Sequence, residues 1–137
     1  LLKFRPRLRE LQTAGYKVRT TTVENGHWKY WQRFCQRHNL GLWRDDRDAN
    51  TGRDRAGFQE EVDIMAAFLI DVLQAMPSRY PRPEPLPSSA GNVLRGIRRI
   101  HAKQTPPIEM VPFAAVMPII KGLNREYMQR HTYRMLP

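Results

Sequence analysis

Cysteine is nearly absent from this chain of 137 residues, which contains Cys35 alone. One thiol cannot form an internal disulfide, and it cannot supply the several thiolates that most structural zinc sites use. Small secreted domains held together by disulfides are therefore excluded as a class. We expect the protein to work in a reducing, intracellular compartment, and we predict no metal site and no cofactor.

Long hydrophobic runs are missing as well. The two longest apolar stretches, residues 64–73 and 111–120, are interrupted by Asp71 and by Pro118. Both are shorter than the roughly 20 apolar residues that a membrane-spanning helix needs. No signal peptide is visible at the N-terminus. We therefore expect a soluble protein with no membrane partner.

Acidic residues are scarce relative to basic ones, with 13 Asp and Glu against 23 Lys and Arg, a formal net charge of +10. The excess is segregated, because residues 1–44 carry a net +8, residues 45–87 a net −4 and residues 88–137 a net +6. Self-repulsion at this density favours a polyanionic partner. Basic ends can contact a phosphate backbone while an acidic middle turns to solvent. A ribosomal or RNA-packaging protein would show the same excess.

Strand signals are also nearly absent, and apolar residues instead recur every three to four positions in four segments. The four stripes are Trp28, Trp31, Phe34, Cys35 and His38; Val62, Met65, Ala66, Leu69, Val72 and Leu73; Ala90, Val93, Leu94, Ile97, Ile100 and His101; and Val116, Ile119, Ile120, Leu123 and Tyr127. This period is that of an amphipathic helix. The sequence therefore predicts one all-α domain over residues 20–130, a compact bundle of four main helices.

The first helix has a start signal and a stop signal. Thr21 and Glu24 have the spacing of a capping box, so we predict that the helix begins at Thr21. It should end by Asn39, with Gly41 as the stop signal just beyond. Residues 1–19, ahead of the capping box, are basic with weak periodicity. We expect them to form a basic N-terminal arm or a short helix around Arg7 to Thr13.

The other helices are predicted from similar signals. The second should begin near Phe58, with acidic residues in its first turn, where the helix dipole favours them. Ser88 or Ser89 should cap the third helix. The fourth should begin near Met117, because the proline that follows is tolerated only in the first turn, and residues 112–116 should form a separate turn.

Three connections join these helices. Residues 44–57 are almost wholly charged and polar, which predicts an exposed loop. Five prolines alternate with other residues over 77–87, which predicts an extended connection. Residues 104–112 form a second connection that contains proline.

Two passages resemble a known family. TVENGHWKYWQRFCQRHNL, at residues 22–40, resembles the opening helix of the core-binding (SAM-like) domain of tyrosine recombinases and phage-type integrases, in which a Thr-capped helix carries aromatics and an aromatic-Cys pair. SSAGNVLRGIRRIHAKQ, at residues 88–104, is similar to the third helix of that domain, with its Ser/Thr cap, aliphatic-His pair and basic tail. Residues 60–73 and 113–127 are similar to the second and fourth helices. The order and spacing of the four helices match that domain over residues 20–130. The nearest analogy is with phage recombinases and with the recombinases of eukaryotic mobile elements.

The resemblance implies a division of labour within a longer protein. The family's nucleophilic Tyr and its catalytic Arg, Lys and His residues lie on a following domain, so no catalytic residue is expected in this chain. Residues 131–137 would begin the linker to that domain. The implied partner is double-stranded DNA, with no small-molecule substrate and with a homo-oligomer, a tetramer on paired sites, in the full-length protein. The protein would act in the nucleus if eukaryotic and in the cytoplasm if bacterial or phage.

The resemblance also implies which residues face DNA, because the first and third helices of the family lie at the major groove. The implied contacts are Lys29, Tyr30, Arg33, Arg37, Ser89, Gly91, Asn92, Arg95, Arg99 and Lys103. These residue types suit contact with a duplex, because Arg donates two bonds to guanine, Asn pairs with adenine, and Lys and Ser hold phosphates. Gly91 would let the backbone come close to the duplex.

Three other interpretations stay open. Arg95, Arg98 and Arg99 can be a solvated helix face, as most helical charges are. The chain can also be an RNA-binding or ribosome-associated helical protein. Double-stranded RNA hides its base edges in a deep narrow groove, so this interpretation predicts competition by RNA and no preference for a DNA palindrome. Lastly, the basic helices can dock an acidic protein partner.

Several residues carry weaker signals. Oxygen-bearing side chains at residues 46–54 have the spacing of a calcium loop, but Thr51 and Gly57 stand where an EF-hand needs Gly and Glu. We interpret most of the remaining candidates as structural: His38 and His101 as capping or partly buried histidines, Trp28 and Trp31 as core residues, Cys35 as a buried small hydrophobe, and Tyr133, near His131 in the linker region, as a linker or docking residue. Trp43 lies outside the helix and can be either a core residue or a base-stacking platform.

Overall fold

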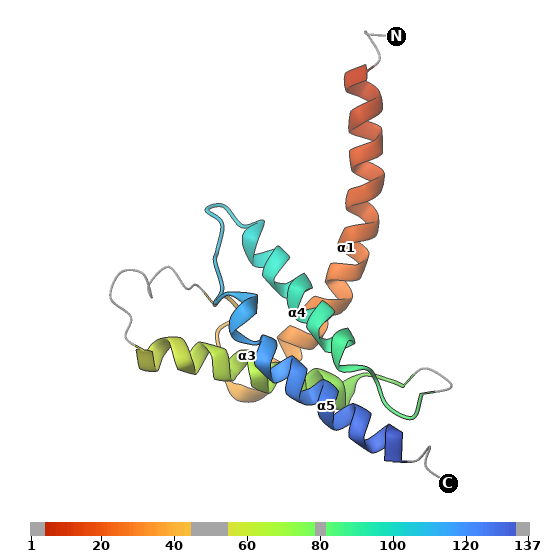
Figure 1. Ribbon diagram of the computed structural model, residues 1–137. Helices are drawn as coiled ribbons and strands as arrows, with labels where there is room; N and C mark the ends of the chain where they lie inside the picture. The colour runs from red at the N-terminus through yellow and green to blue at the C-terminus, as the bar shows by residue number, and fades with distance from the viewer. Residues whose placement is uncertain (1–4, 45–54, 79–81, 134–137) are drawn as a thin grey trace.

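The computed structural model describes residues 5–44, 55–78 and 82–133, and the side chains within 22–44, 57–78 and 82–131. These residues form four α-helices and one short 3₁₀ helix, and they contain no strand (Figure 1). The elements are α1 (Arg5–His38), α3 (Arg55–Ala75), α4 (Pro87–Ala102), η1 (Phe113–Ala115) and α5 (Met117–Tyr133). The predicted all-α bundle is confirmed.

The start of α1 differs from the prediction. The helix passes through Thr21 without a break, so the capping box there is wrong. Glu24 does not reach back to an N-cap, because its carboxylate is 5% exposed and accepts hydrogen bonds from Lys103 on α4. Glu24, which the sequence predicted as part of a helix cap, instead joins α1 to α4. The backbone of residues 5–19 belongs to α1. The side chains of these residues lie outside the described ones, so the expected basic arm stays a prediction.

The end of α1 lies where the sequence placed it, but the stop residue is Asn39. Its φ of 54° is the left-handed conformation that reverses the chain at a helix C-terminus. The amide of Leu40 then donates to the carbonyl of Cys35 over 2.9 Å, and the amide of Asn39 donates to Gln36 over 3.4 Å. This pattern is a Schellman motif. Gly41, the predicted stop signal, follows it and needs no left-handed backbone.

The remaining boundaries confirm one prediction and correct two. α5 begins at Met117 after the separate turn η1, as predicted. α3 begins at Arg55, three residues before the predicted Phe58. α4 begins at Pro87, with Leu86 as N-cap and no side-chain cap, so the predicted serine caps are wrong. Proline is favoured at the first helical position because its missing amide would be unpaired there anyway.

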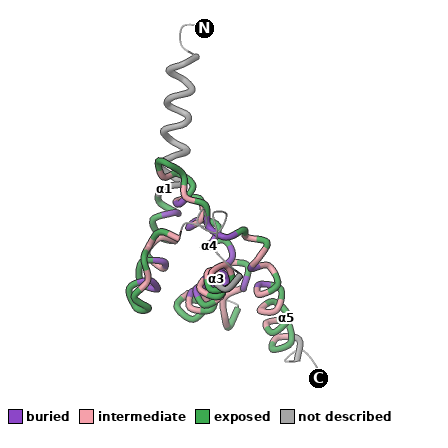
Figure 2. The backbone as a smooth tube through the Cα atoms, turned by 90° about the vertical axis from the view of Figure 1, so that its left-hand side faces the viewer, coloured by how far each residue is buried: buried purple, intermediate pink, exposed green. Residues whose placement is uncertain are grey.

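The core forms where α4 contacts the other three helices (Figures 1 and 2). Buried residues line the inner side of each helix, and exposed residues line the outer side (Figure 2). The core residues are Trp31, Phe34 and Cys35; Val62, Met65, Phe68, Leu69 and Val72; Ala90, Val93, Leu94 and Ile97; and Met110, Val111, Val116 and Ile120. The hydrophobic stripes read from the sequence supply most of this core, and α4 is its central element.

Aromatic rings join α1 to α3. Phe68, which the predicted stripe of the second helix omits, is fully buried. Its ring meets that of Trp31 edge-on with centroids 5.0 Å apart, and it lies 5.4 Å from Phe34. Phe68 follows Met65 by three positions, so helical spacing alone contained the signal.

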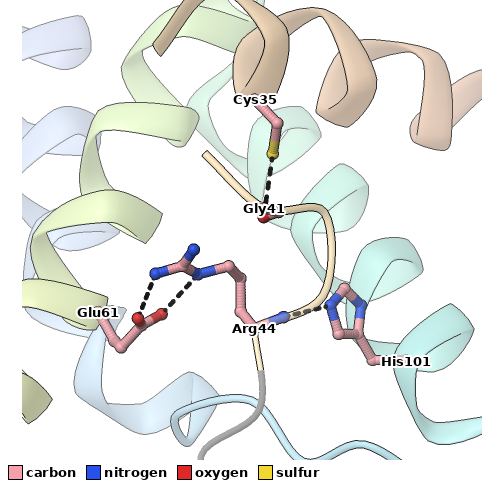
Figure 3. Close-up of polar contacts among 5 residues, drawn as sticks. All are labelled: Cys35, Gly41, Arg44, Glu61 and His101. Carbon is pink, nitrogen blue, oxygen red and sulfur yellow. Dashed lines mark hydrogen bonds and ion pairs between the residues drawn. The ribbon is translucent and has the colours of Figure 1, made fainter. Parts of the chain in front are cut away.

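The segment after α1 returns to the core instead of leaving as an exposed loop. Trp31 Nε1 donates to the carbonyl of Leu42 over 2.8 Å, and Cys35 Sγ lies 3.8 Å from the carbonyl of Gly41. The backbone amide of Arg44 donates to Nε2 of His101 over 3.1 Å, and its guanidinium pairs with Glu61 on α3 (Figure 3). The predicted exposed loop over 44–57 is therefore wrong at Arg44 and at the first turn of α3, and its middle lies outside the described residues.

Candidate nucleic-acid interface

The predicted first and third helices lie against each other in antiparallel register. Glu24 of α1 contacts Lys103 near the end of α4, and His27 lies directly over Gly96 in its middle. Tyr30 lines the same pocket as Asn92 near the start of α4. The two stretches that carry the predicted DNA contacts are thus neighbours along one seam. Their charged residues are nevertheless distributed over several faces.

The outer side of α4 carries a polar and basic stripe, defined here as Asn92, Arg95, Arg99 and Lys103, all of them exposed. Spacings of three and four residues place them on one face of the helix. The Arg95 guanidinium lies 4.3 Å from the centroid of the Phe113 ring and donates to Asn92 Oδ1 over 3.3 Å. These contacts hold Arg95 in place along the helix surface.

The C-terminal end of this outer stripe is partly neutralised. Lys103 Nζ lies 2.9 Å from both carboxylate oxygens of Glu24, and Arg99 Nε lies 3.6 Å from one of them. The carboxylate is nearly buried, while the two cations keep about half of their side chains exposed. One acid therefore attaches two cations of α4 to α1 and lowers the net charge of this end.

The predicted contacts on α1 fall into separate groups. Lys29 and Arg33 are exposed and lie about 200° around the helix from fully buried Trp31, so they point away from the core. Arg37 is also exposed, but it pairs with Asp71 of α3 at 2.5 Å. Tyr30 is half-buried at the seam with α4. Among the residues the structure describes, Lys29 has no ion-pair partner.

The prediction that Gly91 lets the backbone approach DNA is wrong. It is buried, and a Cβ there would lie 3.5 Å from Ile120 and 3.8 Å from Phe113. The glycine thus faces α5 and η1, inside the protein, and its backbone cannot approach a duplex. Ser89 is only half-buried and lines the pocket at the seam.

Arg98 is not a free surface charge. Its guanidinium donates to the carbonyl of Val111 in the connection before η1. Burial lowers the pKa of the Arg98 side chain. The interpretation of Arg95, Arg98 and Arg99 as one solvated face is therefore wrong for Arg98, which attaches the connection to α4.

Two described acids of the acidic middle pair with cations of the fold, while Glu60 and Asp63 are exposed to solvent as predicted. Glu61 and Asp71 of α3 have side chains 13% and 14% exposed, and they pair with Arg44 and Arg37. The hydrogen bond to Glu61 raises the pKa of Arg44. These acids compensate cations near α3 and leave the outer stripe of α4 with Glu24 as its acidic neighbour.

A third acid joins the proline-rich connection to α5. Glu84 pairs with Arg130 at 2.7 Å and with His131 at 2.9 Å. Hydrogen bonds from His131 and Arg130 lower the pKa of Glu84. His131 therefore has a structural contact with the proline-rich connection.

Two histidines lie under the seam. His101 is fully buried: its Nδ1 lies 2.9 Å from the carbonyl of Ile97, and its Nε2 accepts from the amide of Arg44. This arrangement requires a neutral ring, and burial lowers the pKa of His101 below its ordinary 6.5. Burial, followed by the charge of Arg99, also lowers the pKa of His27, whose Nδ1 is buried without a partner.

The remaining candidates behave mainly as structural residues. Trp31 is fully buried, as predicted, whereas Trp43 is 44% exposed and lies over His101 and Trp28 with ring centroids 5.0 and 5.1 Å away. Burial raises the pKa of Cys35 to about 11, so its thiol stays protonated near neutrality. The buried small hydrophobe predicted there is confirmed.

No cluster of three or more potential metal ligands exists among the described side chains. The possible calcium loop at residues 46–54 lies outside the described part of the chain. Within the described residues, no helix combines the length and the hydrophobicity needed to span a bilayer.

Two residues at the seam have no sequence signal that identifies them. Arg82 lies in the proline-rich connection and reaches the pocket beside Asn92 and Tyr30. His27 lies against Gly96 because the two helices cross there. Both positions depend on how distant segments pack, which periodicity within one helix cannot reveal.

Comparison with protein-family models, with curated proteins and with solved structures finds no match to this chain.

Proposed function

We propose that this chain binds double-stranded DNA through the outer stripe of α4 and the adjoining part of α1, as the non-catalytic core-binding domain of a tyrosine recombinase or integrase. It would contribute affinity and part of the target recognition, while a separate domain cuts and rejoins strands. The observation that carries the proposal is the antiparallel seam, which brings the two basic helices together under one exposed polar stripe.

The stripe has the chemistry that a major groove requires. The groove is wide enough for an α-helix, and its base edges present acceptors to Arg and paired donor and acceptor sites to Asn. Asn92 and Arg95 are already hydrogen-bonded to each other and exposed on one face. Arg99 and Lys103 lie further along this face, where they can contact phosphates.

The charges of the neighbouring helices support the same surface. Acids of α3 compensate Arg37 and Arg44, and Glu24 is the single acid contacting the outer stripe within the described chain. Lys29 and Arg33 lie exposed on the outer side of α1 and have no acidic partner among the described residues. A strand that contacts these cations would release condensed counterions at each neutralised phosphate.

The resemblance to recombinases supports the biological role. It implies that the full-length protein acts as a tetramer on paired sites. The tetramer would work in the nucleus of a eukaryote or in the cytoplasm of a bacterium or of a phage host. A role in RNA binding or in docking an acidic protein rests on the overall charge alone, so both become outcomes of the test.

The test is selection from a randomised duplex library at two salt concentrations, with double-stranded RNA as competitor. We expect enrichment of a half-site of an inverted repeat and a steep fall of affinity with salt. Equal competition by RNA without sequence enrichment would favour the RNA-binding role. Weak affinity for both nucleic acids would favour the protein-docking role.

A further inference from the structure

A pocket of about 370 Å³ opens beside the N-terminal half of α4, between α1 and the proline-rich connection. Its polar lining comes from His27 and Tyr30 of α1, from Arg82 of the connection, and from Ser89 and Asn92 of α4. Its apolar lining includes Met76 and Leu86. The volume lies at the lower end of the range for small-molecule sites, and the lining combines apolar and polar residues as such sites do.

The polar lining supplies donors that are not used within the protein. The Arg82 guanidinium and the hydroxyls of Tyr30 and Ser89 have no hydrogen-bond partner in the described part of the chain. Asn92 uses its oxygen to accept from Arg95, which leaves its amide nitrogen as a donor. Several unused donors around one pocket fit an acceptor-rich ligand.

The pocket also lacks a compensating acid. No carboxylate lines it among the described residues. Glu84, only two residues from Arg82, is held by Arg130 and His131 instead. An exposed guanidinium beside two hydroxyls and an amide, with no acid among them, is an environment that favours an anion with several oxygens, and phosphate is the group that Arg recognises with paired hydrogen bonds.

We propose that this pocket binds a single nucleotide, with the phosphate on Arg82 and its neighbouring donors and the base against the apolar lining residues. A bare phosphate would leave Met76 and Leu86 without a contact, whereas the faces of a base are apolar and flat. The nucleotide is either free or an extruded unit of a bound strand. The second source rests on the proposed function, because Asn92 belongs both to the pocket and to the outer stripe of α4.

The test is a titration of the full chain with deoxyadenosine monophosphate, followed by NMR of the Arg82 Nε–H and the Asn92 side-chain amide. We expect saturable shifts at both groups, and binding about tenfold weaker for inorganic phosphate and for deoxyadenosine. Arg82→Gln should weaken the nucleotide about tenfold, and Tyr30→Phe a few-fold. Lys121→Gln on α5, an exposed cation outside the pocket, is the matched control and should leave binding unchanged.

Two results would overturn the pocket assignment: no shift at these groups up to millimolar nucleotide, or equal binding by Arg82→Gln and the parent chain with the same urea midpoint. A chain that binds duplex DNA but no nucleotide refutes this inference and leaves the proposed function standing. A chain that binds the nucleotide but no duplex refutes the proposed function and leaves this inference standing. Tighter binding of a duplex with one unpaired nucleotide than of a fully paired one identifies the extruded unit, and equal binding identifies free nucleotides.

Discussion

The two sides of α4 differ in what their residues contact. The inner side fits closely against other helices, with Gly91 against α5, Gly96 against α1 and His101 fully buried. The outer stripe is exposed. Arg95 contacts Asn92 of the same stripe, and Arg99 and Lys103 lie against Glu24 of α1. One helix thus combines two roles, since its inner side determines stability and its outer side is available for a partner. Substitutions on the two sides should therefore have different kinds of effect.

The largest effect is expected from His101→Ala. The substitution leaves a cavity beneath the seam and removes the acceptor for the amide of Arg44, so we expect it to lower the free energy of unfolding by about 2–4 kcal/mol. Urea unfolding measures this. The control is Ser88→Ala, an exposed position in the first turn of α4, which should change stability by less than about 0.5 kcal/mol. Equal effects at both positions would contradict the division between the sides.

The next effect separates two glycines of the inner side. At Gly96 a Cβ would overlap Nδ1 of His27 and lie 3.0 Å from its Cγ, whereas at Gly91 the contacts are ordinary ones of 3.5 Å and more. We expect Gly96→Ala to cost about 1–3 kcal/mol through overpacking. Gly91→Ala should be neutral or stabilising by up to about 1 kcal/mol, since alanine favours a helix. Urea midpoints of the pair decide this, and the reverse ranking would show that α1 does not cross α4 at Gly96.

A smaller effect is expected from acid. Burial lowers the pKa of His101 and of His27 below 6.5, so the unfolded chain takes up protons before the folded one does. Stability should be fully present above pH 6.5 and should fall as the pH drops below it, by at most about 1.4 kcal/mol per pH unit for each histidine. Urea unfolding between pH 7.5 and pH 5.5 measures the loss. The His101 ring resonances should not titrate near 6.5, and a midpoint there would contradict its neutral, buried state.

The smallest effect concerns Glu24, which joins the two helices at the end of the outer stripe. Glu24→Gln removes the carboxylate that holds Lys103 and lies near Arg99, so both cations become available to phosphates. We expect duplex affinity to rise a few-fold and stability to fall by about 1 kcal/mol. Fluorescence anisotropy with a labelled duplex measures the first change. Unchanged or weaker binding would mean that this end of the stripe does not face DNA.

The sequence predicted the parts of the fold that depend on periodicity. Trp31, Met65, Leu94 and Ile120 each fall on a stripe with helical spacing, and each is buried. The helix boundaries were less predictable. Thr21 and Glu24 have the residue types of a cap, but a carboxylate can equally pair with cations of another helix, and local spacing does not distinguish the two.

The candidate site was predictable to the same limited degree. The resemblance grouped Asn92, Arg95 and Arg99 as DNA-facing residues of one helix, and they are exposed on one face. The resemblance also placed Gly91 with them, yet it faces α5 because it lies closer to the buried stripe around the helix. Arg82 enters the site through the fold of a connection, and no repeat in the sequence indicates where such a residue lies.

The most direct test of DNA binding by the outer stripe of α4 compares two charge-matched double variants. Arg95→Gln with Arg99→Gln removes two cations of the stripe, and Lys121→Gln with Arg125→Gln removes two exposed cations at the same spacing on α5. The quantity to measure is duplex affinity by anisotropy at two salt concentrations. We predict about a tenfold loss and a shallower salt dependence for the α4 pair, with less than about a threefold loss for the α5 pair. Equal losses in the two pairs, or none, would contradict the account.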